Sequence, residues 1–250
     1  MRFFRFIIVA LLLPLIFSFA YEAYLFLISD VDFDLVDWFL YGALSYILLF
    51  ILILQSSAKL RYLVTLVEHF KHEMAHSLVG FIFLRRTRRI IVNPKDPKAE
   101  PKDEETSKVS FFDSSGPDSL ISLAPYYLPL FTVPLLLLEP IVICSAVEII
   151  DYLIGFTLTF HFVSVVREFR LIQKDITETG VIFSFFITCI LNVIMLVIAL
   201  CVVSSEYPKI LGYLQSSLER TLDSYKTVYQ MLRTLDDLTA SSNGPPMTWQ

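Results

Sequence analysis

The stretch YLVTLVEHFKHEMAHSLVGFIFL, residues 62–84, combines the length of a membrane helix with charged and metal-binding side chains. At its centre, His72, Glu73 and His76 form an HExxH pattern. Residues four apart lie on one face of an α-helix, so both imidazoles can bind a single Zn²⁺. Glu73 lies beside them and can act as general base for a water molecule activated by that metal. The pattern therefore predicts zinc-dependent hydrolysis in or beside a membrane.

The composition is typical of a polytopic membrane protein. Of the 250 residues, 55% are hydrophobic and 18% are charged, and the mean hydropathy is +0.64. Long runs of Leu, Ile, Val and Phe exclude a soluble hydrolase. The net charge is only −5, and no basic cluster interleaved with aromatic residues indicates a nucleic-acid partner. Three cysteines lie in apolar runs without CxxC spacing, which favours buried thiols over zinc ligands: Cys144, Cys189 and Cys201.

Apolar segments of nearly membrane-spanning length divide the chain. They are residues 6–28, 35–54, 62–84, 119–138, 141–166 and 180–203. Each is close to the roughly 20 residues that a helix needs to cross the hydrocarbon core. The first segment follows basic residues like a signal peptide, but its apolar run continues beyond residue 20, which favours a retained helix. We therefore predict an all-α polytopic membrane protein with about six transmembrane helices.

The polar stretches define the organisation of the chain. We expect an N-terminal transmembrane hairpin at residues 1–56 and a core carrying the HExxH pattern at residues 57–204. An amphipathic helix should follow at residues 205–240, and a disordered tail at residues 241–250. Two strand-like runs flank a Pro-rich, charged stretch in the loop 85–118, which predicts a small β-hairpin after the metal helix. The amphipathic helix could dock on the bundle, lie on the bilayer, self-associate or bind a regulatory partner.

Basic residues give conflicting indications of membrane orientation. Clusters lie at Arg2 and Arg5, at residues 85–89, and at Arg167 and Arg170. The positive-inside rule would place all three on the cytoplasmic face. With six full crossings, the three clusters cannot all lie on the cytoplasmic face. Either the N-terminus lies outside, or one early segment, such as the third, does not cross the membrane.

A third metal ligand is needed from another part of the chain, because catalytic zinc has three protein ligands and one open position. The candidates are Asp175, His161, Glu168, Asp151, Glu148 and Glu139. We favour Asp175, which stands just before the last span, although a carboxylate there could simply cap a helix. His161 is the second choice, with an interhelical hydrogen bond as its alternative role. His69 is expected to be a surface residue or a neighbour of the ligands.

The run His72-Glu-Met-Ala-His76-Ser-Leu-Val-Gly80 resembles the metal helix of the site-2 protease family of intramembrane zinc metalloproteases. A β-hairpin commonly follows that helix in the family, as residues 89–112 would here, and the next span begins with a small-residue-Pro step, matched by Ala124-Pro125. The resemblance implies zinc bound by His72, His76 and an aspartate from a later span, Asp175. The family usually has glycine after that aspartate, whereas this chain has isoleucine.

The resemblance makes the expected function intramembrane proteolysis of a membrane protein substrate, with Glu73 as general base. A membrane transporter that uses the same residues as an ion path is one alternative. A non-catalytic membrane scaffold with partners at residues 205–240 is another. Short loops between the spans favour a multi-pass protein of a bacterial inner membrane.

Overall fold

The computed structural model describes residues 2–32, 35–84, 87–91, 108–111, 119–170 and 173–242, and these are mostly helical. The helices are α1 (Arg2–Ser29), α2 (Asp37–Gln55), α3 (Ala58–Ile82), α4 (Ser119–Tyr127), α5 (Thr132–Leu138), α6 (Cys144–Glu168), α7 (Lys174–Thr179), α8 (Val181–Val203) and α9 (Tyr207–Ser242). A 3-10 turn, η2 (Glu139–Ile141), follows α5. Strand β1 (Thr87–Ile91) pairs antiparallel with β2 (Lys108–Phe111). The expected hairpin tip and the tail after residue 242 lie outside the described residues.

Four helices of the described part are long and apolar enough to cross a membrane: α1 from Ala10, α2, α6 from Ala146, and α8. A fifth span exists if the bent pair formed by α4 and α5 is counted as one. The expected multi-pass, mainly helical fold is confirmed at this level. The described residues support four or five spans where the sequence predicted about six, and the segment at residues 62–84 is one that does not qualify.

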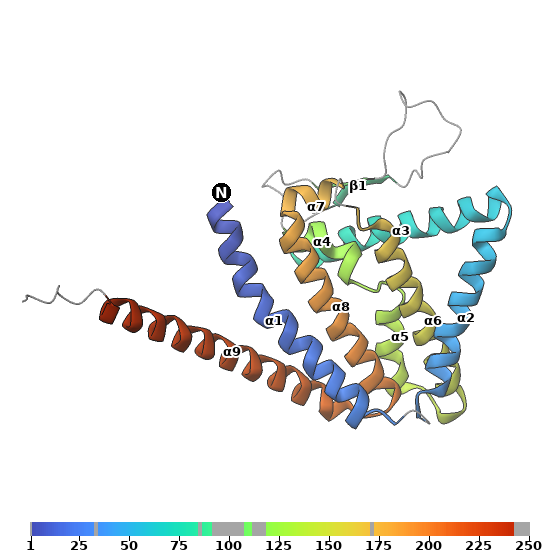
Figure 1. Cartoon of the computed structure of the whole chain (residues 1–250). Coiled ribbons are helices and arrows are strands. Elements are labelled where there is room, and N and C mark those ends of the chain that lie inside the picture. The colour runs from blue at the N-terminus through green and yellow to red at the C-terminus, as the bar shows by residue number, and fades with distance from the viewer. Residues whose placement is uncertain are drawn as a thin grey trace, which may run out of the picture.

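Helix α3 covers most of this segment but does not qualify as a span, because charged residues interrupt its apolar run. Arg61, Glu68, Lys71 and Glu73 all lie within it. Figure 1 shows α3 lying across one end of α2, α6 and α8, at a steep angle to them. The geometry agrees with the alternative in which the third segment does not cross.

The predicted span 119–138 is broken in its middle. Helices α4 and α5–η2 meet at an angle of 75° after residues 128–131. Pro129 explains the break, because proline has no N–H to donate and disfavours helical geometry in the residue before it. The break turns α4 toward α3, so residues near Ile121 contact α3.

The end of the bundle that carries α3 also carries the described elements that adjoin the basic clusters of the orientation conflict (Figure 1). Helix α1 starts there, β1 packs there and α6 ends there. The opposite end holds the α1–α2 turn, η2 and the start of α9, which are joined by a 3.3 Å ion pair between Lys209 and Asp30 and by a Tyr207–Glu139 hydrogen bond. Because α3, a helix of 25 residues, lies across the bundle and not along it, the conflict is removed.

Helices α2 and α6 pack with their backbones in direct contact. A Cβ atom added at Gly42 would lie 1.9 Å from the Tyr152 carbonyl oxygen, and one added at Gly155 would lie 2.0 Å from the Phe39 carbonyl oxygen. No side chain fits at either crossing point. This pair therefore fixes α6, whose last residue contacts the candidate site.

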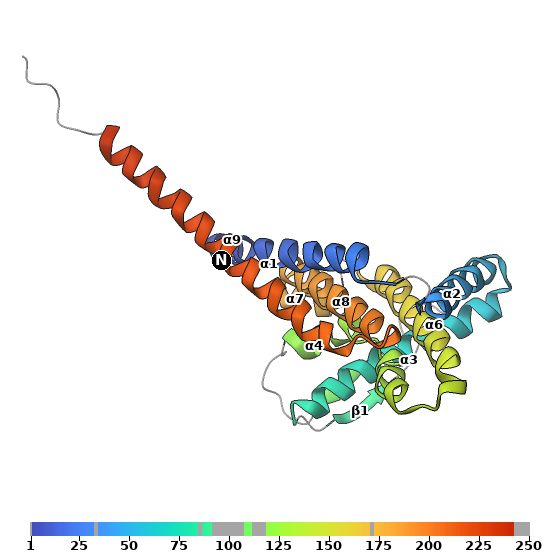
Figure 2. The same cartoon turned by 90° about the horizontal axis from the view of Figure 1, so that it is seen from below.

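Helix α9 docks on α1 through its first half. Tyr213 donates a 3.1 Å hydrogen bond to the Phe19 carbonyl, and Arg220 lies 2.6 Å from the Glu22 carboxylate. Figure 2 shows the remainder of α9 projecting away from the bundle. The predicted amphipathic helix is therefore present, and its first half packs on the bundle.

The α2–α6 contact gives a test of the fold. We expect Gly42→Ala to lower the free energy of unfolding by about 1 to 3 kcal/mol, because the methyl group would force two backbones apart. Gly212→Ala in α9 is the control, since a Cβ there meets nothing within 4 Å and alanine favours a helix by up to about 1 kcal/mol. Thermal unfolding in detergent measures both. Equal effects of the two substitutions would contradict the close packing.

Candidate metal centre

Helix α3 has a polar face that points into the protein and an apolar face that points out. Its buried polar residues are Glu68, Lys71, His72, Glu73 and His76. Glu68, His72 and His76 are four residues apart and share one side of the helix, and Lys71 and Glu73 flank His72 on that side. Large apolar side chains such as Phe70, Leu78 and Phe81 are exposed on the other side. A helix of this kind is stable only where the bundle supplies polar partners for its inner face.

The imidazole of His76 is oriented by α4. Its Nδ1 lies 2.7 Å from the carbonyl oxygen of Ile121. A carbonyl oxygen can only accept, so Nδ1 carries the hydrogen and the Nε2 lone pair points the other way. This carbonyl is free because its usual helical partner would be the N–H of the residue four positions later, and that residue is Pro125. The proline thus allows the helix to orient His76.

The imidazole of His72 is oriented by α6. Its Nδ1 lies 3.2 Å from Oε2 of Glu168. An ionised carboxylate accepts, so Nδ1 again carries the hydrogen and Nε2 carries the lone pair. Tyr126 holds the same ring from another side, with its own ring edge-on at 5.6 Å between centroids.

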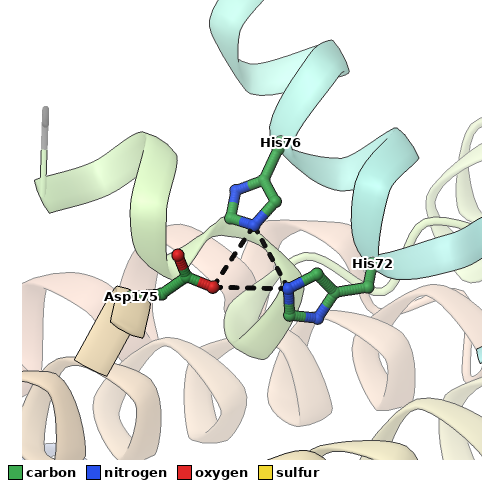
Figure 3. Close-up of side chains that lie close together, drawn as sticks. All are labelled: His72, His76 and Asp175. Carbon is green, nitrogen blue, oxygen red and sulfur yellow. Dashed lines mark hydrogen bonds and ion pairs between the residues drawn. The ribbon is translucent and has the colours of Figure 1, made fainter. Parts of the chain in front are cut away.

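Three acceptor atoms converge where these rings meet α7 (Figure 3). Nε2 of His72 and Nε2 of His76 lie 3.2 Å apart, and they lie 3.4 and 3.6 Å from Oδ2 of Asp175. Zinc bonds of about 2.0 to 2.2 Å in a tetrahedron place ligand atoms about 3.3 to 3.6 Å apart. A cation between two lone pairs and a carboxylate at this spacing would be bound favourably. The group could therefore hold a metal ion.

Asp175 reaches this position because α7 is a single short helix that ends at Gly180, whose φ of 103° permits a sharp turn into α8. Burial raises the pKa of Asp175, but the adjacent His72 and His76 side chains outweigh it and hold that pKa below its usual range. Burial lowers the pKa of His72, but the carboxylates of Asp175 and Glu168 raise it to about 9, so Nε2 of His72 must give up a proton when a metal ion binds. The cluster thus attracts positive charge.

Glu73 completes the arrangement. Its side chain is 3% exposed, and its Oε2 has no hydrogen-bond partner among the described residues. Burial raises the pKa of Glu73, while the neighbouring charges of His72 and His76 oppose that rise. A buried carboxylate oxygen without a partner beside a possible metal group can accept a proton from a water molecule or a substrate.

The remaining candidates from the sequence do not join this group. His161 makes the interhelical hydrogen bond given as its alternative, with Nε2 3.0 Å from Oδ1 of Asn192. His69 binds its own helix through the Thr65 carbonyl at 2.9 Å. Glu168 lies on the Nδ1 side of His72, away from Asp175. Three acidic residues lie toward the opposite end of the bundle, near η2 and the start of α6: Glu139, Glu148 and Asp151.

Two contributors to the site could not be recognised from the sequence. Pro125 was noted only as part of a motif, because its effect depends on the position of Ile121 beside His76. Tyr126 gave no signal, although its hydroxyl is buried without a partner among the described residues. Comparisons of the chain with protein-family models, curated proteins and solved structures found no match.

Metal analysis tests the group directly. We expect detergent-purified protein to contain about one transition-metal ion per chain, because three oriented acceptor atoms match a tetrahedral set with one open position. His72→Ala, His76→Ala and Asp175→Ala should each lose it. His69→Ala and His161→Ala are matched controls that should keep it. Metal retained in Asp175→Ala would show that another residue completes the site.

The role of Pro125 gives a second test. In Pro125→Ala the new N–H would compete with His76 for the Ile121 carbonyl, so we expect metal affinity to fall several-fold. Competition with a chromophoric chelator measures the dissociation constant. Pro134→Ala is the control, because Pro134 stands in α5, beyond the break that follows α4. The same affinity in both variants would exclude a role for the freed carbonyl.

Proposed function

We propose that this protein is an intramembrane zinc metalloprotease, a metalloendopeptidase that hydrolyses a peptide bond in or next to a membrane-spanning segment of its substrate. The observation that carries the proposal is the convergence of His72, His76 and Asp175 beside the unpartnered carboxylate oxygen of Glu73. These groups stand at the end of a bundle of membrane-spanning length. The resemblance of residues 72–80 to the site-2 protease family supports the same function.

Zinc is the metal that this donor set fits best. Two imidazole nitrogens and one carboxylate oxygen with an open fourth position are typical of catalytic zinc in hydrolases. When bound, zinc supplies an activated water molecule and polarises the substrate carbonyl. The chain contributes the orientation of both imidazoles through Glu168 and the Ile121 carbonyl. Fixed donors of this kind need no rearrangement when charge develops in the transition state.

Glu73 is the group that moves the proton. Its carboxylate takes a proton from the attacking water and passes it to the nitrogen of the leaving amine. Its burial supports this role, because a carboxylate shielded from solvent exchanges its proton with the reacting groups rather than with bulk water. A non-catalytic scaffold would have no need of an unpartnered acid at this position.

The location of the site favours peptide bonds near one membrane face. Asp175 lies in the short helix α7, directly before the α8 span. Glu168 is the last residue of the α6 span. The basic residues at this end favour the cytoplasmic face under the positive-inside rule. In a bacterium this membrane would be the inner one. The paired strands β1 and β2 contact α3 and offer an edge on which an extended substrate could add a strand.

A transporter remains the second candidate, and buried polar groups inside the spans favour it. Asp151 and His161 of α6 each have a buried atom without a hydrogen-bond partner among the described residues. Ionisable residues in spans commonly mark ion paths. Metal flux into liposomes without any proteolysis would select this candidate over the protease.

Substitution of the general base tests the protease proposal. In Glu73→Gln we expect zinc content to be unchanged and cleavage of single-pass transmembrane peptides to fall about 10²- to 10⁴-fold, because the proton acceptor is lost. Mass spectrometry of a peptide panel in liposomes measures cleavage. Glu178→Gln is the control, since Glu178 is an exposed carboxylate on α7 near Asp175. Zinc-loaded Glu73→Gln that cleaves at the wild-type rate would refute the role of Glu73.

A further inference from the structure

Two consecutive residues at the end of α6 connect the bundle to the metal helix by opposite charges. Arg167 lies 2.6 Å from Glu68, and Glu168 lies 3.7 Å from the ammonium of Lys71. The same oxygen of Glu168 lies 3.2 Å from Nδ1 of His72. The partners on α3 are thus three and four residues apart and share one face of the helix.

Lys71 is held almost entirely away from solvent. Its side chain is 1% exposed, and its ammonium lies 5.7 Å from the centre of the Phe160 ring. A buried ammonium is stable only beside a carboxylate or an equivalent partner. Glu168 is the carboxylate within ion-pair distance among the described residues. The ion pair therefore favours the charged form of the Glu168 carboxylate at the end of α6, by charge and without a hydrogen bond.

We propose that Glu168, held in place by Lys71, is the positioning residue of the metal centre. It accepts the Nδ1 hydrogen of His72, and this fixes both the ring orientation and the nitrogen that faces Asp175 and His76. The inference rests on the proposed function, because it needs a metal at the site. It assigns Glu168 a role different from the ligand role considered for it from the sequence.

The geometry separates the two carboxylates that contact His72. Asp175 lies 3.4 Å from Nε2, and Glu168 lies 3.2 Å from Nδ1. A neutral imidazole can donate through one nitrogen and bind a metal only through the other. Asp175 faces Nε2 of His72, the nitrogen that also faces His76. Glu168 faces Nδ1, which is therefore the nitrogen that donates the hydrogen. Its charge raises the basicity of the nitrogen that would bind the metal.

Lys71 adds a constraint that a hydrogen bond alone would not supply. It directly precedes His72, and both reach the same oxygen of Glu168. A rotation of α3 would break both contacts together. The charged pair thus fixes the angle of the metal helix about its own axis, and the bond to His72 fixes the ring.

The test compares three variants: Glu168→Gln, Lys71→Met, and the double variant. In Glu168→Gln the amide oxygen can still accept, but the charge is lost, so we expect the zinc dissociation constant to rise about 10- to 100-fold. Both single variants leave a buried partner without its counter-charge and should unfold at lower temperature. The double variant removes both charges and should recover thermal stability without recovering zinc affinity.

Zinc affinity is measured by chelator competition on the full-length protein in detergent, and unfolding is measured on the same samples. Glu148→Gln is the matched control, because Glu148 is an exposed carboxylate at the other end of α6. Wild-type affinity in Glu168→Gln, or recovered affinity in the double variant, would overturn the positioning role and leave the protease proposal intact. A wild-type protein that binds no zinc would overturn both.

Discussion

The burial of the polar face of α3 is the constraint on which the structure depends. The five ionisable side chains of this face would be costly in lipid or in an apolar core without polar neighbours. The bundle supplies these neighbours from α4, α6 and α7, and each of those helices ends or breaks near α3. The same contacts that satisfy the charges also orient the imidazoles. Stability of the helix and geometry of the candidate metal centre therefore have one physical origin.

Much of the site could be predicted from the sequence, because it depends on the spacing of residues that are close together in the chain. The spacing of His72 and His76 fixes their common face on any helix, and Asp175 is a carboxylate at the start of the last span. The direction of α3 was left open by the sequence, because the basic residues allowed two alternatives and only one of them has the third segment not crossing the membrane. Its length and flanking apolar residues are those of a span, and only the bundle shows that its charged face is buried against other helices. The prediction of about six spans included this segment for that reason.

Long-range contacts account for the other differences. Sequence reasoning identified Pro125 only as part of a motif and Glu168 only as one of several candidate ligands, and it did not predict their contacts, since His72 and Glu168 are 96 positions apart. A proline is usually read as a helix breaker, whereas here its missing N–H leaves a carbonyl available to another helix. The sharp break after α4 could not be read from an apolar run either, because hydropathy reports composition and not direction.

The distance along the chain between α3 and its partners has a consequence for biosynthesis. When α3 leaves the ribosome, neither Glu168 nor Asp175 has yet been made, and its ionisable face has no protein partners. At that stage a position at the membrane surface is favoured in free energy, with the exposed apolar side of the helix toward lipid and its polar side toward water. It can turn that polar side inward only after α6 and α7 are in place. The candidate metal centre is therefore assembled late, which prevents a half-made chain from carrying a complete site.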